Sequence, residues 1–322
     1  MVKKEFEKRN EILENPKTVF ISNCENGWYV LKEILENQPK YKVVGVLTTP
    51  KPEDPDKVSG YKDFSELTDK FGVKLYQLTS LKNPNSLQLL NSLSPDIIFC
   101  IGWSRIIGKD ILDLPPFGVI GMHPTLLPEG RGRAPIPWAI LKGLKKSGVT
   151  MFYLDEGVDT GDIIDQEEFS IDFEDDAKKV YEKSIQTMVS LAKKNLNLIS
   201  QNTVMRKKQN SSKATYWEQR RPEDGIIDWS KSSFENYNFI RGLSKPYPGA
   251  FGFLHDKKIK IWKAKIKENE SNNDEAGLIT GKNKTNKSFT VNCKIGSIEI
   301  EDFEGIDFDQ ILVGDHLSKN ES

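Results

Sequence analysis

Short apolar runs alternate with amphipathic stretches along the first part of the chain. The four apolar runs are continuous, which is typical of strands buried on both faces. They lie at 18–22, 42–47, 95–101 and 118–122. The stretches between them carry apolar residues at helical spacing at 27–35, 63–71 and 84–93, with Val73-Lys74-Leu75-Tyr76 between the last two. This alternation predicts an α/β domain with a mostly parallel sheet covered by helices on both faces, Rossmann-like in type.

The pattern continues with a helix and a hairpin and then changes. We expect a helix at 135–144, a hairpin of strands at 149–154 and 163–167, and a long helix at 172–199. Residues 201–215 are polar and basic and predict an exposed linker. A helix at 232–243 and short strands with turns follow, which predicts a small C-terminal β-barrel, OB-like in size. These strands are expected within 250–267, 276–281 and 288–302, with a solvated hairpin loop over the Lys/Asn/Glu-rich stretch 267–287.

The length of 322 residues suits two domains. From the patterns we expect four segments along the chain. They are a charged N-terminal extension at 1–16, an α/β domain at 17–200, a linker at 201–215 and a β-barrel-like domain at 216–316.

Charge and cysteine content narrow the class of protein. The 46 basic and 47 acidic residues are interspersed and give a net charge of −1. Proteins that neutralise many phosphates usually carry a basic excess, so we expect no nucleic-acid partner. Three widely spaced cysteines predict neither a disulfide framework nor a zinc site, and Cys100 is expected to be a small buried hydrophobe. Without an apolar leader or a run of about 20 apolar residues, we expect no membrane association and a cytoplasmic location.

Three histidines are candidates for moving a proton near neutral pH. His255 falls at an expected hairpin turn and His316 in a polar tail, so both are interpreted as surface residues. His123 instead ends an apolar strand and precedes a loop of unusual composition, in Gly121-Met122-His123-Pro124. Asp159, in a Val-Asp-Thr-Gly turn, could orient such a histidine and favour its charged form, although a turn aspartate is also ordinary turn chemistry.

The strand ends place these residues at one rim. Ligands bind beyond the carboxyl ends of the strands in open parallel sheets. We therefore expect His123 to share that rim with Asn23-Cys24 and Gly102-Trp103-Ser104, which follow two other predicted strands.

The loop after His123 resembles the signature of a known family. His123-Pro-Thr-Leu-Leu-Pro-x-x-Arg-Gly, followed by Val158-Asp159-Thr160-Gly161, is similar to the motif set of the 10-formyltetrahydrofolate-dependent formyltransferases. The likeness continues in Gly102-Trp103-Ser104-Arg105-Ile106-Ile107, and in Arg221-Pro222-Glu223-Asp224-Gly225 at the start of the C-terminal barrel of two-domain members. It covers about residues 17–300 and implies a formyltransferase domain followed by a small barrel.

The resemblance implies formyl transfer from 10-formyltetrahydrofolate, a co-substrate, to an amine, with no metal. It makes His123 the proton shuttle or oxyanion partner, oriented by Asp159. It also implies that two stretches hold the folate: Trp103, Arg105, Ile106 and Ile107 on one side, and Asp155, Glu156, Gly157 and Val158 on the other.

Gly121 departs from the family pattern. Members usually have an asparagine two residues before the histidine, whose amide holds the formyl oxygen. Losing one such donor typically lowers the rate by about 10²–10³. The candidate replacements are Ser104, Thr125 and a backbone N–H near Gly121, while the glycine could also serve close approach of the backbone to a ligand.

Arg133 favours a sugar-nucleotide substrate. Its Arg-Gly-Arg-Ala-Pro context looks like the formyltransferase module that acts on a UDP-linked aminoarabinose, and arginine is a good diphosphate partner. Together with Asn23 and Arg131 it forms the expected substrate-binding set. We expect a small-molecule acceptor, a dTDP- or UDP-linked 4-amino-4-deoxy sugar of surface-glycan (lipopolysaccharide) biosynthesis, and the assembly is compatible with a homodimer. The alternatives are methionyl-tRNA as acceptor, hydrolysis of formyltetrahydrofolate, and a folate- or nucleotide-binding regulator that has lost catalysis.

Overall fold

The computed structural model describes residues 15–37, 41–54, 60–103, 105–267 and 275–319, so most of the predicted N-terminal extension lies outside the described residues. The chain forms two compact units, each assembled from three stretches. The first comprises Met1–Gly132, Ser147–Phe169 and Lys183–Trp217, and the second Arg133–Lys146, Ser170–Glu182 and Glu218–Ser322. This grouping cuts across the linear domain boundaries expected from the sequence.

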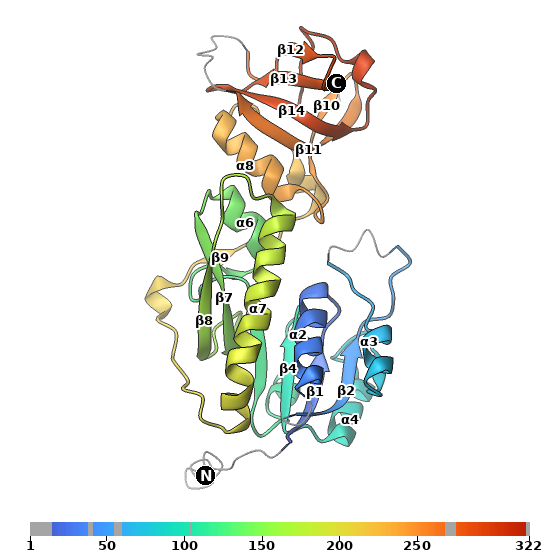
Figure 1. Ribbon diagram of the computed structural model, residues 1–322, viewed down its shortest axis with the longest axis vertical. Coiled ribbons are helices and arrows are strands. Elements are labelled where there is room, and N and C mark those ends of the chain that lie inside the picture. Colours follow the sequence, from blue (N-terminus) through green and yellow to red (C-terminus); the bar gives the residue numbers. More distant parts are fainter. Residues whose placement is uncertain (1–14, 38–40, 55–59, 104, 268–274, 320–322) are drawn as a thin grey trace. The chain divides into compact units, whose positions relative to one another are not determined.

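A seven-stranded sheet forms the centre of the first unit (Figure 1), in the order β3-β2-β1-β4-β5-β7-β8. The strands are β1 (Lys17–Ile21), β2 (Lys42–Thr48), β3 (Leu75–Gln77), β4 (Ile97–Ile101), β5 (Val119–His123), β7 (Lys146–Tyr153) and β8 (Ile163–Ser170). The first five pair in parallel, and β7 is antiparallel to β5. The predicted mostly parallel α/β fold is confirmed.

Helices cover both faces of the sheet, and successive residues of each strand point to opposite faces. Phe20 and Phe99 pack with side chains of α2 (Glu25–Glu36) and α7 (Ala177–Ser200). Residues next to them in the same strands, including Ile98 and Cys100, pack with side chains of α4 (Pro84–Leu93) and α5 (Lys109–Leu112) on the other face. Both faces are therefore apolar, which explains the continuous apolar runs. A short helix, α3 (Ser65–Lys70), completes this part. Of the helices described, none is long and apolar enough to cross a membrane.

The long helix begins later than predicted, at Ala177 instead of residue 172. The Asp176 carboxylate accepts the N–H of Lys179 at 2.8 Å, the contact of an N-cap residue. One turn earlier, the Asp175 carboxylate accepts the N–H of Asp172 at 2.8 Å. These carboxylates hold residues 172–176 in turns. The acidic residues therefore lie before the helix and cap its N-terminus instead of forming its first turn.

The second unit carries a five-stranded antiparallel sheet in the order β10-β11-β14-β13-β12. The strands are β10 (Ala250–Leu254), β11 (Lys257–Lys267), β12 (Ile279–Asn283), β13 (Ser288–Asn292) and β14 (Ser297–Glu304), with helices α6 (Pro135–Leu141) and α8 (Ser233–Leu243). Ser318 exchanges two backbone hydrogen bonds with Phe253 at one edge, and Leu317 bonds Gly277 beside the other. The C-terminal segment thus joins both edges, as expected of a small barrel. β12 overlaps the strand predicted at 276–281 and extends into the stretch 267–287 predicted to be a loop, of which residues 268–274 are not described.

The two remaining histidines are surface residues, as predicted. His255 lies in the turn between β10 and β11, with its side chain 52% exposed and 3.1 Å from the Asp315 carboxylate. The His316 side chain is 41% exposed.

Residues 206–217, which fall in the predicted linker and just after it, pack onto the first unit. Lys207 exchanges two backbone hydrogen bonds with Ile163, at 2.8 and 2.9 Å. The short strand β9 (Tyr216–Trp217) pairs in parallel with β6 (Arg131–Gly132), in the loop after His123. The segment therefore belongs to the same compact body as the predicted site, and we call it the 206–217 strap.

Candidate active site

His123 is the last residue of β5 and lies at the carboxyl edge of the sheet. The strand register places Met122 beside Ile101 of β4, and Cys100 beside Ile21 of β1. The residues that follow β1 and β4, Asn23 and Trp103, consequently lie at this same edge. The predicted rim is therefore present in the structure.

A buried threonine on the neighbouring strand fixes the loop that follows His123. Thr150 lies opposite His123 in the β5–β7 pair and is fully buried. Its hydroxyl donates to the carbonyl of Thr125 at 2.7 Å and accepts the N–H of Leu127 at 3.0 Å. The amide of Gln166 donates to the same hydroxyl at 2.8 Å. These contacts hold the Leu-Leu-Pro loop in one position relative to the histidine.

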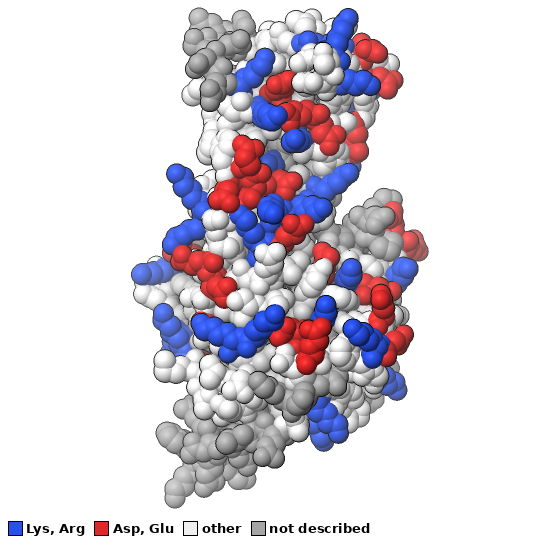
Figure 2. All heavy atoms as spheres, in the orientation of Figure 1, with Lys and Arg blue, Asp and Glu red and all other residues white. Residues whose placement is uncertain are grey.

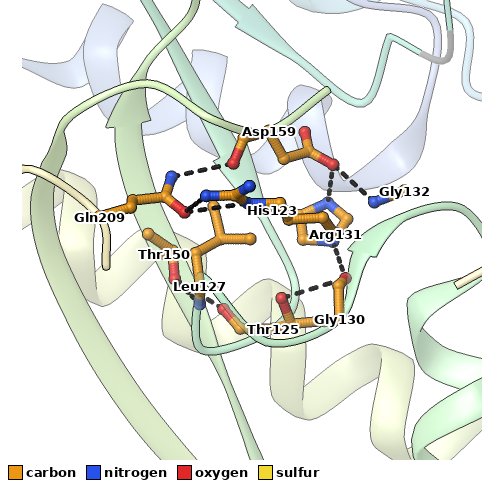
Figure 3. A network of polar contacts seen from close by, with 9 residues as sticks. All are labelled: His123, Thr125, Leu127, Gly130, Arg131, Gly132, Thr150, Asp159 and Gln209. Atoms are coloured by element: carbon orange, nitrogen blue, oxygen red, sulfur yellow. Dashed lines mark hydrogen bonds and ion pairs between the residues drawn. The ribbon is translucent and has the colours of Figure 1, made fainter. Parts of the chain in front are cut away.

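The imidazole of His123 lies between two acceptors (Figure 3). Nε2 is 2.8 Å from the carbonyl oxygen of Gly130, and Nδ1 is 3.7 Å from Oδ2 of Asp159. Because a carbonyl oxygen can only accept, the Nε2 atom carries a hydrogen. Nδ1, on the side of the carboxylate, is left as the nitrogen that can gain and lose a proton. The sequence predicted this pair, and the structure brings its two members together.

Backbone groups from one short loop hold both members of the pair. The Gly130 carbonyl contacts His123, and the N–H of Gly132 donates to Oδ2 of Asp159 at 2.8 Å. Gly132 has a φ of 106°, and a Cβ there would lie 2.4 Å from the carbonyl oxygen of Trp217. Only glycine fits this close approach of β6 to β9. The glycine in the Arg-Gly part of the motif is therefore explained by the close packing of β6 against β9.

Arg131 occupies a different place from the one expected of a substrate-binding residue. It is 2% exposed, and its Nε and Nη2 atoms donate to Oε1 of Gln209 at 3.1 and 2.7 Å. Its Nη1 atom donates to the Tyr216 hydroxyl at 2.8 Å. Because these protein groups take up the guanidinium, Arg131 supports the loop beside His123 and Asp159 and is not available to a substrate. Arg133 is exposed and belongs to the second unit, and the amide of Asn23, at the sheet edge, lies 3.4 Å from the Thr49 hydroxyl.

Gly121 is surrounded by side chains of the protein. A Cβ at this position would lie 2.7 Å from Cδ2 of Leu154, so an asparagine side chain does not fit unless Leu154 moves. Of the other oxyanion candidates, Thr125 is 2% exposed and its hydroxyl lies 3.4 Å from the Gly130 carbonyl, which it faces. Ser104 lies outside the described residues. Leu154 thus fills the space next to the glycine where the family's carboxamide is expected.

Replacing Gly121 with asparagine should therefore not restore a missing donor. We expect Gly121→Asn to lower the free energy of unfolding by about 1–3 kcal/mol through overpacking, with no gain in turnover. The double variant Gly121→Asn/Leu154→Ala should recover part of that stability. Gly108→Asn is the matched control, since nothing lies within 4 Å of a Cβ there. Urea unfolding checks the prediction, and a Gly121→Asn protein as stable as the parent would contradict it.

An ion pair connects the second of the two stretches expected to hold the folate with a lysine that follows the first. Lys109, just after the first stretch, contacts Glu156 of the second at 2.9 Å. A pocket of about 460 Å³ is lined by Asp155, Glu156 and Gly157, with Lys109, Tyr153 and Arg206 among its other walls. Arg206 of the strap stacks 3.7 Å over the Tyr153 ring. The strap therefore contributes to this pocket as well.

Several features of these stretches fit a flat, polar-edged ligand. The indole N–H of Trp103 is buried and has no hydrogen-bond partner among the described residues, so an acceptor on a ligand would satisfy it. Ile106 and Val158 are 66% and 45% exposed, which offers apolar surface on both stretches. Ile107, in contrast, is 7% exposed and packs into the core, and the Arg105 guanidinium donates to the carbonyl of Thr79 at 2.8 Å.

The sequence reasoning missed four contributors: Gln209, Thr150, Gln166 and Arg206. Each is a polar or charged residue whose role depends on atoms far away along the chain, so no local pattern marked it. The nearest available signal was the run of polar residues after the long helix, which was interpreted as a solvated linker.

Comparison with known proteins identifies the family. Residues 17–192 match the family described as formyl transferase, and residues 219–307 match the formyl transferase C-terminal domain. The methionyl-tRNA formyltransferase of Clostridioides difficile (strain 630) is 32% identical over 305 residues, which is 94% of this chain and 97% of that protein. The bifunctional polymyxin resistance protein ArnA of Wigglesworthia glossinidia brevipalpis is 34% identical over 226 residues, 70% of this chain and 34% of that protein.

Among solved structures, an N-formyltransferase from Helicobacter canadensis in complex with folinic acid and dTDP-3-aminofucose has the same fold. Its TM-score is 0.64 at 24% identity, over 89% of this chain and 99% of that one. This shared fold and the family matches over both parts of the chain agree with the resemblance seen in the Leu-Leu-Pro loop. The chain therefore belongs to the family of formyltransferases, enzymes that draw on formyltetrahydrofolate, as the sequence predicted.

Proposed function

We propose that this enzyme transfers the formyl group of 10-formyltetrahydrofolate to the primary amine of a nucleotide-linked amino sugar. The observation that carries the proposal is the buried imidazole of His123, held between the Gly130 carbonyl and the Asp159 carboxylate. Formyl transfer to an amine requires a group that moves a proton, and this pair supplies one at the edge of the sheet where ligands bind.

The reaction requires proton transfers, and both members of the His123–Asp159 pair have a role in them. The bound folate supplies the formyl carbon, whose bond to the folate nitrogen breaks as its bond to the amine forms. The amine loses one proton and the folate nitrogen gains one. Nδ1 of His123 takes up the proton of the amine and passes it to the folate nitrogen, while the Gly130 carbonyl keeps the hydrogen on Nε2 in place. The Asp159 carboxylate stabilises the imidazolium that exists between the two transfers.

The formyl oxygen needs a donor other than the asparagine that Gly121 replaces. Leu154 fills that space, and Thr125 is turned toward the Gly130 carbonyl. Once Nδ1 of His123 has taken up the amine proton, its N–H is the donor that we assign to the oxyanion, until the proton passes to the folate nitrogen. A charged donor compensates in part for the lost carboxamide, because charge-assisted hydrogen bonds are the stronger kind.

The charge distribution supports a small acceptor over a tRNA. The net charge is −1, and Lys and Arg side chains are interspersed with Asp and Glu on the face shown in Figure 2. Arg133 is exposed and stands in a run like that of a UDP-aminoarabinose formyltransferase module. The dTDP-3-aminofucose held by the Helicobacter canadensis protein is an acceptor of the same chemical class. Methionyl-tRNA remains the second candidate, because several relatives carry that name, among them the Clostridioides difficile protein.

One assay separates these acceptors. The purified protein is mixed with 10-formyltetrahydrofolate and either dTDP- or UDP-linked amino sugars or methionyl-tRNA, and the release of tetrahydrofolate is followed. We expect turnover with an amino-sugar nucleotide and a weak dependence on salt. Turnover with methionyl-tRNA alone, falling steeply with salt, would overturn the proposed acceptor. Release without any amine would indicate hydrolysis, and no release with any acceptor would favour a binding protein.

A further inference from the structure

Gln209 lies in the 206–217 strap and bonds to the Asp159 backbone and to the Arg131 side chain (Figure 3). We propose that Gln209 is a positioning residue that fixes the geometry of His123 and Asp159 for proton transfer. This inference rests on the proposed role of that pair. It assigns a function in the active site to a segment whose sequence predicts only a linker.

The amide of Gln209 uses its full hydrogen-bonding capacity. Nε2 donates to the carbonyl of Asp159 at 2.9 Å and to the carbonyl of Gly161 at 2.8 Å. Oε1 accepts two N–H groups from the Arg131 guanidinium, at 3.1 and 2.7 Å. Since an amide offers two N–H donors and two lone pairs, no capacity is left for solvent or substrate. Gln209 is therefore built into the site as a structural connection between two loops.

Those two loops are the ones that carry the catalytic contacts. Gly130 and Gly132, on either side of Arg131, hold His123 and Asp159 through backbone atoms. The Asp159 backbone has a φ of 53°, a left-handed conformation that is uncommon for residues other than glycine and needs support from its surroundings. By holding the Asp159 turn and the Arg131 side chain together, Gln209 determines the distance between Nδ1 and the carboxylate.

The rest of the strap holds the same loop. The hydroxyl of Thr215 accepts the N–H of Gly130 at 2.8 Å, and the carbonyl of Thr215 accepts the N–H of Arg131 at 2.9 Å. Only Gln209 among these residues reaches the Asp159 turn as well. Its removal should disturb the relation between the two loops while Thr215 keeps the Gly130 loop in place.

Gln209→Glu is the sharpest test, because it separates the two contacts. The new carboxylate keeps the size of the side chain and pairs with Arg131, but its second oxygen faces the carbonyls of Asp159 and Gly161 without a hydrogen to donate. We expect kcat to fall between about 10- and 100-fold, as small misplacements of catalytic groups do, with KM for both substrates within about twofold.

Gln201→Glu is the matched control, since Gln201 is exposed, precedes the strap and undergoes the same change of charge. It should leave kcat and both KM values unchanged. Gln209→Met serves as a second variant if Gln209→Glu does not fold, and should show the same loss of kcat. An active parent whose kcat survives both Gln209 substitutions would overturn the inference while the proposed function stands.

An inactive parent would instead count against the proposed function, and the inference can then be tested without turnover. The ¹⁵N signals of the His123 imidazole, followed over pH, report how closely Asp159 faces Nδ1. We expect the titration of Nδ1 to differ between the parent and Gln209→Glu, and to agree between the parent and Gln201→Glu. Superimposable titrations in all three proteins would overturn the positioning role.

Discussion

Replacing His123 with alanine should lower kcat for formyl transfer by about 10²–10⁴-fold, the usual contribution of a positioned acid–base group. The reason is that Nδ1 takes up and returns the amine proton in the proposed mechanism, and the structure shows no second histidine beside it among the described residues. KM for the folate and for the amino sugar should change little, because the His123 side chain is 10% exposed and offers little binding surface. Steady-state kinetics with both substrates varied checks the expectation.

His255→Ala is the matched control for this variant. The His255 side chain is 52% exposed and lies in the C-terminal unit, so the same substitution there should leave kcat within a factor of about two. Urea unfolding of both variants shows whether a loss of activity reflects a loss of folded protein. A folded His123→Ala enzyme with the kcat of the parent would refute the role of the histidine.

Asp159→Asn should lower kcat by about 10²-fold with the backbone preserved. Asparagine tolerates the left-handed conformation seen at this position, and its carbonyl oxygen can still accept the N–H of Gly132. What the substitution removes is the negative charge 3.7 Å from Nδ1, to which the proposed mechanism assigns the stabilisation of the imidazolium between the two proton transfers. The loss should consequently appear in kcat at every pH at which the parent is active.

Asp69→Asn provides the comparison for Asp159→Asn, because Asp69 is an exposed carboxylate on α3. It should show the kcat of the parent. If Asp159→Asn retains more than about half of the parental kcat, the carboxylate does not act on the histidine, and the pair reduces to His123 alone.

The fold followed from hydrophobic patterning because its strands are buried on both faces. Phe20 and Ile98 pack on opposite sides of the sheet, and such strands appear in a sequence as uninterrupted apolar runs. The position of His123 followed in the same way, since the end of a parallel strand marks the edge at which ligands bind. These features depend on local sequence, and local sequence was sufficient to predict them.

The supporting contacts could not be predicted, because they join polar groups far apart in the chain. Gln209 bonds backbone carbonyls 48 and 50 residues earlier, and nothing in its polar neighbourhood distinguishes it from a solvated glutamine. Arg131 was expected to face a substrate, and the sequence holds no sign that neutral groups of the protein would bury it. Gly121 was recognised as a departure from the family pattern. The side chain that fills its space belongs to Leu154, which follows β7 and is far from Gly121 in the sequence.

The most direct measurement is a single-turnover reaction with 10-formyltetrahydrofolate labelled with ¹³C in the formyl group. The parent, His123→Ala and Asp159→Asn are each mixed with the amino-sugar nucleotide that the acceptor assay identifies, and the label is followed by NMR. We predict that the label appears in the sugar amide with the parent and at least about 10²-fold more slowly with either variant. Label that enters the amide at the same rate in all three proteins, or that is found only in free formate, would contradict formyl transfer by the His123–Asp159 pair.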